Sequence, residues 1–328
     1  MALPARHPLA LLPTPLVEAP RLAAALGGPR LFIKRDDLTG FGGGGNKVRG
    51  LEFYLADALA QQADVIVTGA GPQSNHIRVT AAAALVAGLD MVAVMHGSPP
   101  SATQGNLLLD RLLDIEIRFT ASPDRSVVDR MIRDVAAELR AAGRRPYVVP
   151  RGGASALGAL GYLACVAELN AQCKALALRP AWLVLATGSC GTQSGLLAGG
   201  RIHGQPYRVL GFTVSRPQAE CVERIRRLAV AAAALAGHSV DFAPAEIDVR
   251  GGFIGGGYGV PTPEGIAAIR LAAQTEGLFL DPTYSGKGLA GLIAEIRAGR
   301  IGADATVIFL HTGGEPGIFA HAEAFGKV

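Results

Sequence analysis

The chain has 328 residues, of which 49% are hydrophobic and 18% are charged. This balance supports extensive burial and argues against disorder, which combines low hydrophobicity with high charge. The length exceeds the roughly 100 to 200 residues of a typical single domain, so two lobes are predicted. The 31 basic and 27 acidic residues are scattered and leave a net charge of +4, which does not predict a nucleic-acid partner. The densest basic stretch, Arg224, Arg226 and Arg227, is interpreted as a solvated helix face without a function.

The remaining composition argues against a metal site, a disulfide scaffold and a membrane segment. Four residues are cysteines: Cys165, Cys173, Cys190 and Cys221. They form no CxxC pair and have no histidines at metal-ligand spacing. The longest aliphatic run, 228–237, is about half the roughly 20 residues that a membrane-spanning helix needs. Arg6, His7 and early prolines stand where a secretory signal would have its apolar segment, so we expect a cytoplasmic protein.

Short β-branched or aromatic runs alternate with longer helical patterns along the chain. Each run ends in glycine or a polar turn. Strand alternating with helix at this spacing predicts an α/β fold with parallel-type sheets covered by helices on both faces. The predicted strands are 31–34, 65–68, 91–95, 147–150, 182–186, 209–214 and 306–310.

Two helices have clear sequence signals. Apolar residues within 47–62 recur at i, i+3 and i+4, which predicts a helix with one buried stripe. Thr262 and Pro263 are typical of an N-cap followed by proline at the first helical position. That second helix is expected to continue to about Gln274 and to stop at Gly277.

The first motif with chemical meaning is 41–47, which places Lys47 directly after a glycine-rich turn and at the start of a helix. Glycines permit a close approach of the backbone, so a cofactor could lie against this loop. A partly desolvated lysine near the positive end of a helix would have its amine favoured neutral, as a Schiff-base nucleophile requires. The alternative is a plain surface lysine.

The second motif, 68–76, follows a predicted strand and precedes an alanine-rich helix. Polar side chains at the carboxyl end of a parallel strand lie at the usual ligand crevice of an open α/β sheet. Backbone N–H groups at such a position suit a carboxylate. Simple helix capping by Ser74 or Asn75 is the alternative. His76 is predicted to be a structural hydrogen-bonding residue and not a catalytic base.

The third motif, 187–195, also lies between a strand and a helix. Glycines and hydroxyls at a helix N-terminus predict an anion nest suited to a phosphate. The segment matches neither the P-loop nor GxGxxG, which argues against a dinucleotide-binding dehydrogenase. A phosphate without a nucleotide therefore fits better, and a tight turn is the simpler alternative.

Two further segments, 281–287 and 309–314, follow apolar strands and end in glycine and hydroxyl residues. Both are expected to close the same crevice. Tyr258 stands within a glycine loop, 255–259, as a substrate-gating side chain would. A loop that is only structural or mobile is the alternative for this last segment.

Taken in order, these segments resemble the D-cysteine desulfhydrase and 1-aminocyclopropane-1-carboxylate deaminase family. The members of this family are pyridoxal-phosphate enzymes of fold type II, the tryptophan synthase β-like fold. The resemblance spans nearly the whole chain and implies a small amino-acid substrate and a homodimer. It also implies a small domain, 52–163, and a large cofactor-binding domain built from 1–51 and 164–328. The matching segments are 34–37, 44–47, 73–76, 187–195, 257–261, 281–284 and 311–314.

The resemblance assigns the cofactor contacts residue by residue. It implies that Lys47 binds pyridoxal phosphate covalently and that Asn75 holds the ring hydroxyl. Thr312 would face the pyridine nitrogen, where a neutral hydroxyl tempers the electron-withdrawing strength of the ring. Ser285 is counted among the cofactor contacts as well. The phosphate would be held by Gly188, Ser189, Cys190, Gly191 and Thr192.

The resemblance also implies a set of substrate contacts: Gln73, Ser74, Asn75, Tyr258 and Tyr284. Lys47, with Ser74 or Tyr284, would serve as the base that takes the Cα proton. Family deaminases carry a glutamate after the tyrosine, whereas the desulfhydrases carry a small hydroxyl residue such as Ser285. D-Cysteine is therefore the leading substrate, eliminated to pyruvate, ammonia and sulfide.

Several alternatives stay open. Within the fold they are a 1-aminocyclopropane-1-carboxylate deaminase and an L-cysteate sulfo-lyase, and outside enzymes a non-catalytic ligand-binding module. Two residues depart from the family pattern without removing a catalytic role. Gly50 stands where a lysine is common, and Cys190 stands where a smaller residue is usual.

Overall fold

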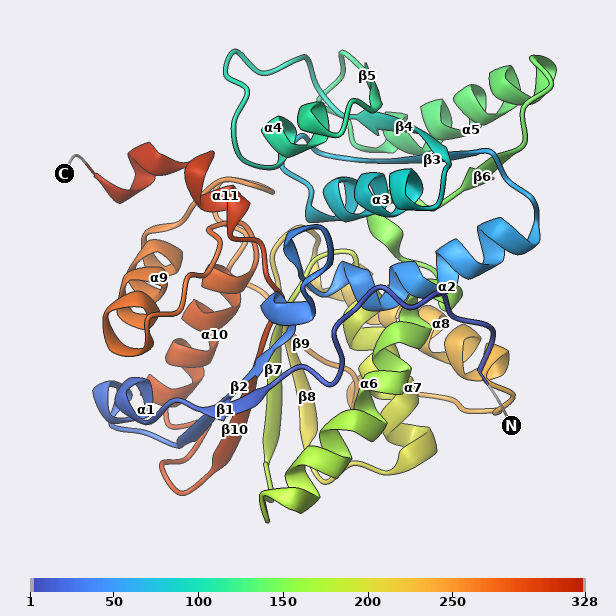
Figure 1. Ribbon diagram of the computed structural model, residues 1–328. Helices are drawn as coiled ribbons and strands as arrows, with labels where there is room; N and C mark the ends of the chain where they lie inside the picture. The colour runs from blue at the N-terminus through green and yellow to red at the C-terminus, as the bar shows by residue number, and fades with distance from the viewer. Residues whose placement is uncertain (1–2, 327–328) are drawn as a thin grey trace.

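The computed structural model describes residues 3–326 as an α/β fold with two sheets (Figure 1). The larger sheet has the order β1-β2-β10-β7-β8-β9, and the smaller has the order β5-β4-β3-β6. Neighbouring strands are parallel, except that β1 runs antiparallel to β2. The strands are β1 (Leu16–Glu18), β2 (Arg30–Arg35), β3 (Val65–Ala70), β4 (Asp90–Met95), β5 (Glu116–Phe119), β6 (Pro146–Val148), β7 (Trp182–Thr187), β8 (Arg208–Thr213), β9 (Asp248–Arg250) and β10 (Thr306–His311).

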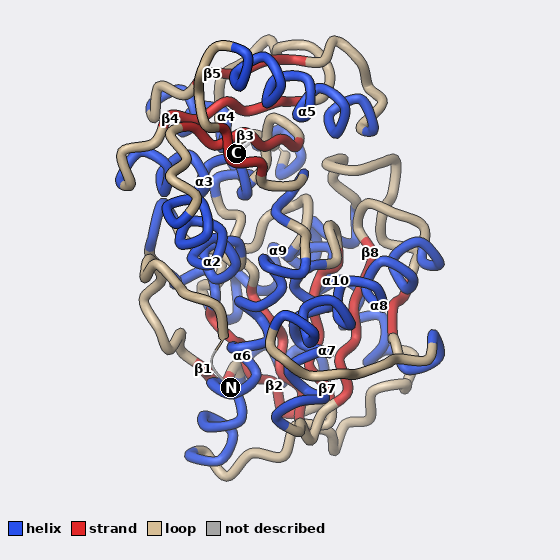
Figure 2. Tube along the Cα trace, turned by 90° about the vertical axis from the view of Figure 1, so that its right-hand side faces the viewer, coloured by secondary structure: helices blue, strands red, loops and turns tan. Residues whose placement is uncertain are grey.

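Helices cover both faces of each sheet, as the view in Figure 2 shows. The α-helices are α1 (Pro20–Leu26), α2 (Lys47–Ala60), α3 (Asn75–Val86), α4 (Gly105–Leu112), α5 (Ser126–Ala141), α6 (Ala156–Ala175), α7 (Gly191–His203), α8 (Gln218–Leu235), α9 (Pro263–Glu276), α10 (Ser285–Arg297) and α11 (Pro316–Phe319). The predicted fold class is confirmed. All seven predicted strands are present, with ends shifted by up to two residues.

Alternation of side chains along the strands builds the cores. On β7, Leu183 and Leu185 join the core under α6, α7 and α8, whereas Val184 joins the core under α9 and α10. Successive residues of a strand point to opposite faces, so one strand serves both layers. The smaller sheet repeats this pattern, because Val65 packs with α5 while its neighbour Ile66 packs with α2 and α3.

The two predicted helices are confirmed. The helix expected over 47–62 is α2, which ends at Ala60. The Thr262 hydroxyl accepts a hydrogen bond of 3.1 Å from the backbone N–H of Gly265 and caps α9. Gly277 follows that helix in a left-handed conformation, with φ of 65°. Such a conformation favours glycine and explains the stop.

Helices α2 and α6 cross where both carry glycine. A Cβ on Gly50 would lie 2.5 Å from the carbonyl oxygen of Gly158, and a Cβ on Gly161 would lie 2.4 Å from the carbonyl carbon of Arg49. Both distances are too short for any side chain, so the two backbones touch. The glycine at position 50, where the family pattern has a lysine, belongs to this contact.

Among the described residues, one helical segment, Arg151–Ala175, is long and apolar enough to cross a membrane. This segment is longer than the alanine-rich run at 228–237, which was the longest aliphatic run expected from the sequence. It contains α6, and half of its most apolar window is buried inside the protein. Leu160 and Leu163 of α6 belong to the core of the larger sheet. A buried core helix meets the same criteria, so this segment is weak support for a membrane span.

The smaller sheet lies in the upper part of Figure 1 and the larger sheet below it. All strands of the smaller sheet fall between Val65 and Val148. The exact domain division, 52–163 against 1–51 with 164–328, stays a prediction.

Candidate active site

A cleft of about 850 Å³, open solvent at its mouth included, lies where strands of both sheets end. Parallel strands bring their carboxyl ends to one edge of a sheet, and ligands bind beyond that edge. Lining residues come from the ends of six strands, β3, β4, β6, β7, β8 and β10. In that order they include Gly71, His96, Gly152, Gly188, Ser215 and Thr312.

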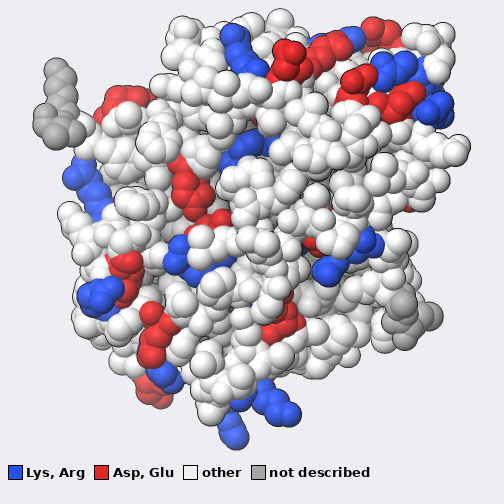
Figure 3. Space-filling view, viewed as in Figure 1, with Lys and Arg blue, Asp and Glu red and all other residues white. Residues whose placement is uncertain are grey.

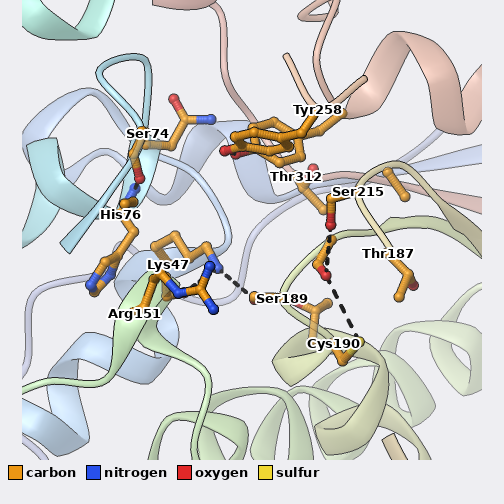
Figure 4. Close-up of a pocket in the computed structure, with 18 of the residues that line it drawn as sticks. Lys47, Ser74, His76, Arg151, Thr187, Ser189, Cys190, Ser215, Tyr258 and Thr312 are labelled. Atoms are coloured by element: carbon orange, nitrogen blue, oxygen red, sulfur yellow. Dashed lines mark hydrogen bonds between the residues drawn. The ribbon is translucent and has the colours of Figure 1, made fainter. Parts of the chain in front are cut away.

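The amine of Lys47 projects into this cleft (Figure 4). Its Nζ donates to the carbonyl oxygen of Gly152 at 2.8 Å and to the Ser189 hydroxyl at 3.1 Å. Burial, with the positive charge of Arg224 acting in the same direction, lowers the pKa of Lys47 to about 8. A substantial fraction of the amine is therefore neutral near pH 8, and the neutral form is the one that attacks a carbonyl.

The glycine turn fixes where α2 begins. Gly44 has φ of 70°, and a Cβ there would lie 2.1 Å from the carbonyl oxygen of Asp37, so only glycine fits. Asn46 joins the turn to two other elements. Its backbone N–H donates to the carbonyl oxygen of Thr312 at 3.0 Å, and its side-chain Nδ2 donates to the Thr192 hydroxyl at 2.9 Å. The lysine that follows Asn46 is thereby held between β10 and α7.

The loop between β7 and α7 has the features of a phosphate cradle. Gly188, Ser189, Cys190 and Thr192 line the cleft, and α7 begins at Gly191. The first N–H groups of a helix have no partner within the helix and carry partial positive charge. Cys190 holds a left-handed conformation with φ of 77°, which turns the chain sharply into the helix.

The interpretation of the basic stretch is wrong for one of its residues. Arg224 is half-buried, and its Nε donates to the carbonyl oxygen of Ser189 at 3.0 Å. Arg224 therefore supports the backbone of the loop between β7 and α7, which has the features of a phosphate cradle. Arg226 instead pairs with Glu223 on the surface, as predicted. Arg224 lies three residues after the buried Cys221, so helical spacing places it beside the buried face of α8. This spacing is the signal that could have identified Arg224.

His76 and Ser74 organise the start of α3. The His76 ring nitrogens lie 2.9 Å from the Thr68 hydroxyl and 3.3 Å from the Thr80 hydroxyl. Burial, aided by the charge of Lys47, lowers the pKa of His76 to about 3, so the ring is neutral and suits the structural role predicted for it. The Ser74 hydroxyl accepts from the backbone N–H of His76 at 3.2 Å. Ser74 also lines the cleft, so it caps the helix and faces the site at once.

Asn75 lines the cleft, but Gln73 does not. The Asn75 Oδ1 accepts from Nδ2 of Asn106 at 2.8 Å. The Gln73 side chain turns toward α4, where its Oε1 accepts from the backbone N–H of Asn106 at 2.9 Å and its Nε2 donates to the Gln104 carbonyl at 3.0 Å. Gln73 thus orients the neighbour that holds Asn75, and the structure does not place it where a substrate contact was predicted.

Two tyrosines close the cleft from the side of the larger sheet. The hydroxyls of Tyr258 and Tyr284 are hydrogen-bonded to each other, and the ring centroids are 6.0 Å apart. Both residues and Thr312 line the cleft, as predicted from the glycine loop and the two C-terminal segments.

Ser285 does not reach the cleft. It is fully buried at the start of α10, where its hydroxyl donates to Oδ1 of Asp281 at 2.7 Å and accepts from the Asp281 N–H at 2.8 Å. Oδ2 of Asp281 also accepts from the backbone N–H of Tyr284 at 2.8 Å. Any influence of Ser285 on the cleft therefore passes through Asp281 and not through a direct cofactor contact.

Four cationic or imidazole side chains at the cleft were not singled out from the sequence: His96, Arg125, Arg151 and Arg216. Three of these residues lie within two positions of the end of a predicted strand: His96 after 91–95, Arg151 after 147–150 and Arg216 after 209–214. The rule that polar residues after parallel strands meet at one edge could have found these three. The fourth, Arg125, comes after β5, a strand that was not predicted.

One group of side chains has the composition of a metal site. Asp37, His311 and Glu315 offer ligand atoms within 4.8 Å of one another. However, Arg35 already donates to both carboxylate oxygens of Asp37, and the backbone N–H of Gly313 donates to His311 Nδ1 at 3.2 Å. With these atoms engaged, we infer no metal centre here.

Comparison with known proteins agrees with this geometry. The pattern of the family described as pyridoxal-phosphate dependent enzyme matches residues 8–313. The chain is 41% identical over 314 residues to a D-cysteine desulfhydrase of Salmonella choleraesuis (strain SC-B67), and 94% of each chain is covered. It is 40% identical over 315 residues to a D-cysteine desulfhydrase of Klebsiella pneumoniae (strain 342), again with 94% of each chain covered. A solved structure described as an ACC deaminase homologue superposes with a TM-score of 0.91 at 37% identity, covering 98% of this chain and 95% of that one.

The chain therefore belongs to the family of pyridoxal-phosphate dependent enzymes. The resemblance stated from the sequence and the type II fold are confirmed, and pyridoxal phosphate is the cofactor. The residues present fit this cofactor. A lysine amine with a lowered pKa faces a loop that can hold a phosphate, and Asn75 and Thr312 line the same cleft.

Proposed function

We propose that this protein is a lyase that removes the β-substituent and the amino group of a small amino acid. With D-cysteine, the substrate and one water molecule would give pyruvate, ammonia and hydrogen sulfide. The observation that carries the proposal is the desolvated amine of Lys47, 3.1 Å from the Ser189 hydroxyl at the phosphate-type loop. The relatives at about 40% identity, which bear the name D-cysteine desulfhydrase, support this choice of substrate.

When bound, pyridoxal phosphate withdraws electrons from the Cα of an attached amino acid and makes its proton easier to remove. Lys47 would hold the cofactor covalently, and Gly188 to Thr192 would hold its phosphate. Asn75 and Thr312 would contact the ring. Ser74, at the N-terminus of α3, would receive the substrate carboxylate. The substrate would then have its Cα near the amine of Lys47.

The titration of the two candidate groups separates their roles. A Lys47 amine with a pKa of about 8 can accept and return a proton near neutral pH. Burial raises the pKa of Tyr284 well above its ordinary value, so its hydroxyl stays protonated and suits a proton donor. We therefore propose Lys47 as the base for the Cα proton and Tyr284 as a donor toward the leaving group, with Ser74 as the alternative base.

The second candidate reaction is the opening of 1-aminocyclopropane-1-carboxylate. The solved structure described as an ACC deaminase homologue favours it, at 37% identity. The buried position of Ser285 against Asp281 is compatible with either reaction, because the hydroxyl lies outside the cleft. An L-cysteate sulfo-lyase is the third candidate and is favoured by the cationic side chains of the cleft.

The decisive experiment measures pyruvate release from D-cysteine, L-cysteine, L-cysteate and β-chloro-D-alanine, and 2-oxobutyrate release from the cyclopropane acid. D-Cysteine is expected to be turned over promptly. Lys47→Ala should lose activity and the absorption band of the covalently held cofactor, which borohydride should also abolish in the wild type. Turnover of the cyclopropane acid alone would end the preference for β-elimination.

We also propose that the enzyme is a cytoplasmic homodimer that acts on a free amino acid. The family resemblance supports this assembly. On the face drawn in Figure 3, basic and acidic side chains are interspersed and form no basic block of the kind that binds nucleic acid. Light scattering should give twice the chain mass of 33.8 kDa. A monomer at that mass would contradict the proposed assembly.

A further inference from the structure

The described lining of the cleft contains positive charges without negative ones. Arg125, Arg151 and Arg216 line it, together with no aspartate or glutamate. Arg151 is paired with Asp129 at 2.8 Å, and Arg216 is paired with Glu220. Arg125 differs from both, because no carboxylate within residues 3–326 forms an ion pair with it. One cation in the cleft is thus left without a counter-charge from this chain.

Most of the hydrogen-bonding capacity of Arg125 is unused. A guanidinium has five N–H donors, and the single acceptor found for Arg125 in the described part of the chain is the Ser215 carbonyl at 3.4 Å. The side chain is half-buried, directly before α5. A desolvated guanidinium interacts more strongly with an anion than an exposed one does.

Arg125 is placed next to the reacting groups through Tyr258. Its guanidinium carbon lies 4.2 Å from the centre of the Tyr258 ring, and the Tyr258 hydroxyl is hydrogen-bonded to Tyr284. His96 packs edge-on against the same ring at 6.3 Å between centroids. The His96 Nε2 is buried and has no hydrogen-bond partner among the described residues. A guanidinium with one long hydrogen bond and an imidazole nitrogen without a partner among the described residues therefore flank one aromatic ring.

This wall suits the β-substituent of an amino acid. The amino group and the carboxylate of the substrate are taken up at Lys47 and at the start of α3, so the substituent on Cβ is the part free to reach the tyrosines. We propose that Arg125 and His96 form an anion subsite for that substituent, so that amino acids with a negatively charged group on Cβ, such as a sulfonate, are accepted beside D-cysteine. The proposal rests on the β-elimination proposed above and specifies its substrate class.

The reaction balances for cysteate. The Cα proton goes to a base in the cleft, the Cβ–S bond breaks, and both bonding electrons leave with the sulfur as sulfite. Water then replaces nitrogen at the former Cα. The products are pyruvate, ammonia and sulfite, with no oxidant or reductant required. Arg125 would hold the sulfonate oxygens before the bond breaks and the sulfite after it.

A purely structural role is the competing explanation. Arg125 connects the loop before α5 to Tyr258 and Ser215 on the other side of the cleft, so it could act only as a clasp. If Arg125 only connects the two sides of the cleft, its loss should weaken the binding of all ligands equally. If it forms a subsite, its loss should weaken the binding of negatively charged ligands most. Aspartate and asparagine separate the two roles, because they have nearly the same shape and differ in the charge on the β-substituent.

The test measures dissociation constants of aspartate and asparagine, as D and L pairs, by calorimetry with the holoenzyme. Wild-type enzyme should bind aspartate about tenfold or more tightly than asparagine, as expected for a charge-assisted pair. Arg125→Leu should bring the ratio close to one, and Arg125→Lys should keep part of it. Arg130→Leu removes the same charge from an exposed position on α5 and should leave the ratio unchanged. The kcat/KM for cysteate should fall about tenfold more than that for D-cysteine in Arg125→Leu.

Equal binding of the pair by the wild type would overturn the subsite. So would an Arg125→Leu variant that keeps the ratio, or one that weakens both ligands equally. The proposed elimination is judged separately, by the cofactor absorption band and by pyruvate release from the whole panel of substrates. A protein with the band and pyruvate release but no charge discrimination refutes the subsite alone.

Discussion

The guanidinium of Arg49 grips the carboxylate of Asp36 with two hydrogen bonds, from Nε at 2.7 Å and from Nη2 at 2.8 Å. Both side chains are buried. Glu168 accepts from Arg49 as well, and Lys34 donates to Glu168. The network joins β2, α2 and α6 at a point two residues from Lys47. Residues 34–37, recognised above as a mark of the family, thus anchor the helix that carries the reactive amine.

Replacing Asp36 by Asn should destabilise the protein strongly. The substitution leaves the Arg49 charge buried without its main partner, and breaking a buried ion pair costs roughly 3 to 5 kcal/mol. Glu168 would recover part of this loss. Urea denaturation of the two proteins measures the difference in unfolding free energy. Glu18→Gln, which breaks an exposed pair with Arg30, is the control and should change little. Similar curves for all three proteins would show that the buried network contributes nothing.

The rate at which the cofactor-free protein takes up pyridoxal phosphate should depend on pH through Lys47. Burial lowers the pKa of Lys47 to about 8 from 10.5, so the neutral amine becomes the major form above pH 8. Below about pH 7 the rate should rise about tenfold per pH unit, and it should level off above about pH 9. The growth of the cofactor absorption band gives the rate. N-acetyl-lysine corrects for ionisation of the cofactor itself, and a rate that keeps rising to pH 10 would contradict the lowered pKa.

Tyr284→Phe should lower kcat by roughly 10² to 10⁴, the usual range for removing an acid–base group. The absorption band of the holoenzyme should persist, because no cofactor contact is assigned to this hydroxyl. Tyr258→Phe removes the partner of the same hydrogen bond and keeps the Tyr284 hydroxyl, so its loss should be smaller. Steady-state pyruvate release ranks the two variants. A Tyr284→Phe enzyme with nearly full kcat would rule out the proposed donor.

Ser285→Ala tests whether this residue touches the cofactor. The Ser285 hydroxyl is bonded to Asp281 outside the cleft, so the affinity for pyridoxal phosphate should stay within about twofold of the wild type. Loss of a buried hydrogen bond should cost about 1 kcal/mol in unfolding free energy. Equilibrium dialysis and urea denaturation give the two quantities. A large loss of cofactor affinity with unchanged stability would restore the contact that the family pattern implied.

The sequence predicted the longer strands well because each combines a β-branched run with a clear glycine or polar stop. It missed β1, β5 and β9, which have only three or four residues and show no long alternation. The antiparallel pairing of β1 was missed with them. Strand order within the sheets depends on which apolar faces pack together, which one sequence does not reveal.

The site was predictable where a motif fixes the backbone and less so where a neighbour fixes a side chain. Lys47 and the loop at Gly188 follow directly from glycine turns at the ends of elements. The side chains of Gln73 and Ser285 point away from the cleft because they are hydrogen-bonded to Asn106 and Asp281. Asn106 comes from a distant segment, and Asp281 lies on the other side of the turn before Ser285.

Gly50 of α2 and Gly161 of α6 allow the backbones of the two helices to touch, and this contact positions α2, the helix that carries Lys47. An added methyl group would wedge the helices apart and carry the first turn of α2 away from Ser189. The amine of Lys47 would then lose its reach although no residue of the cleft had changed. In this chain the position of the helix that carries Lys47 therefore depends on two residues without side chains.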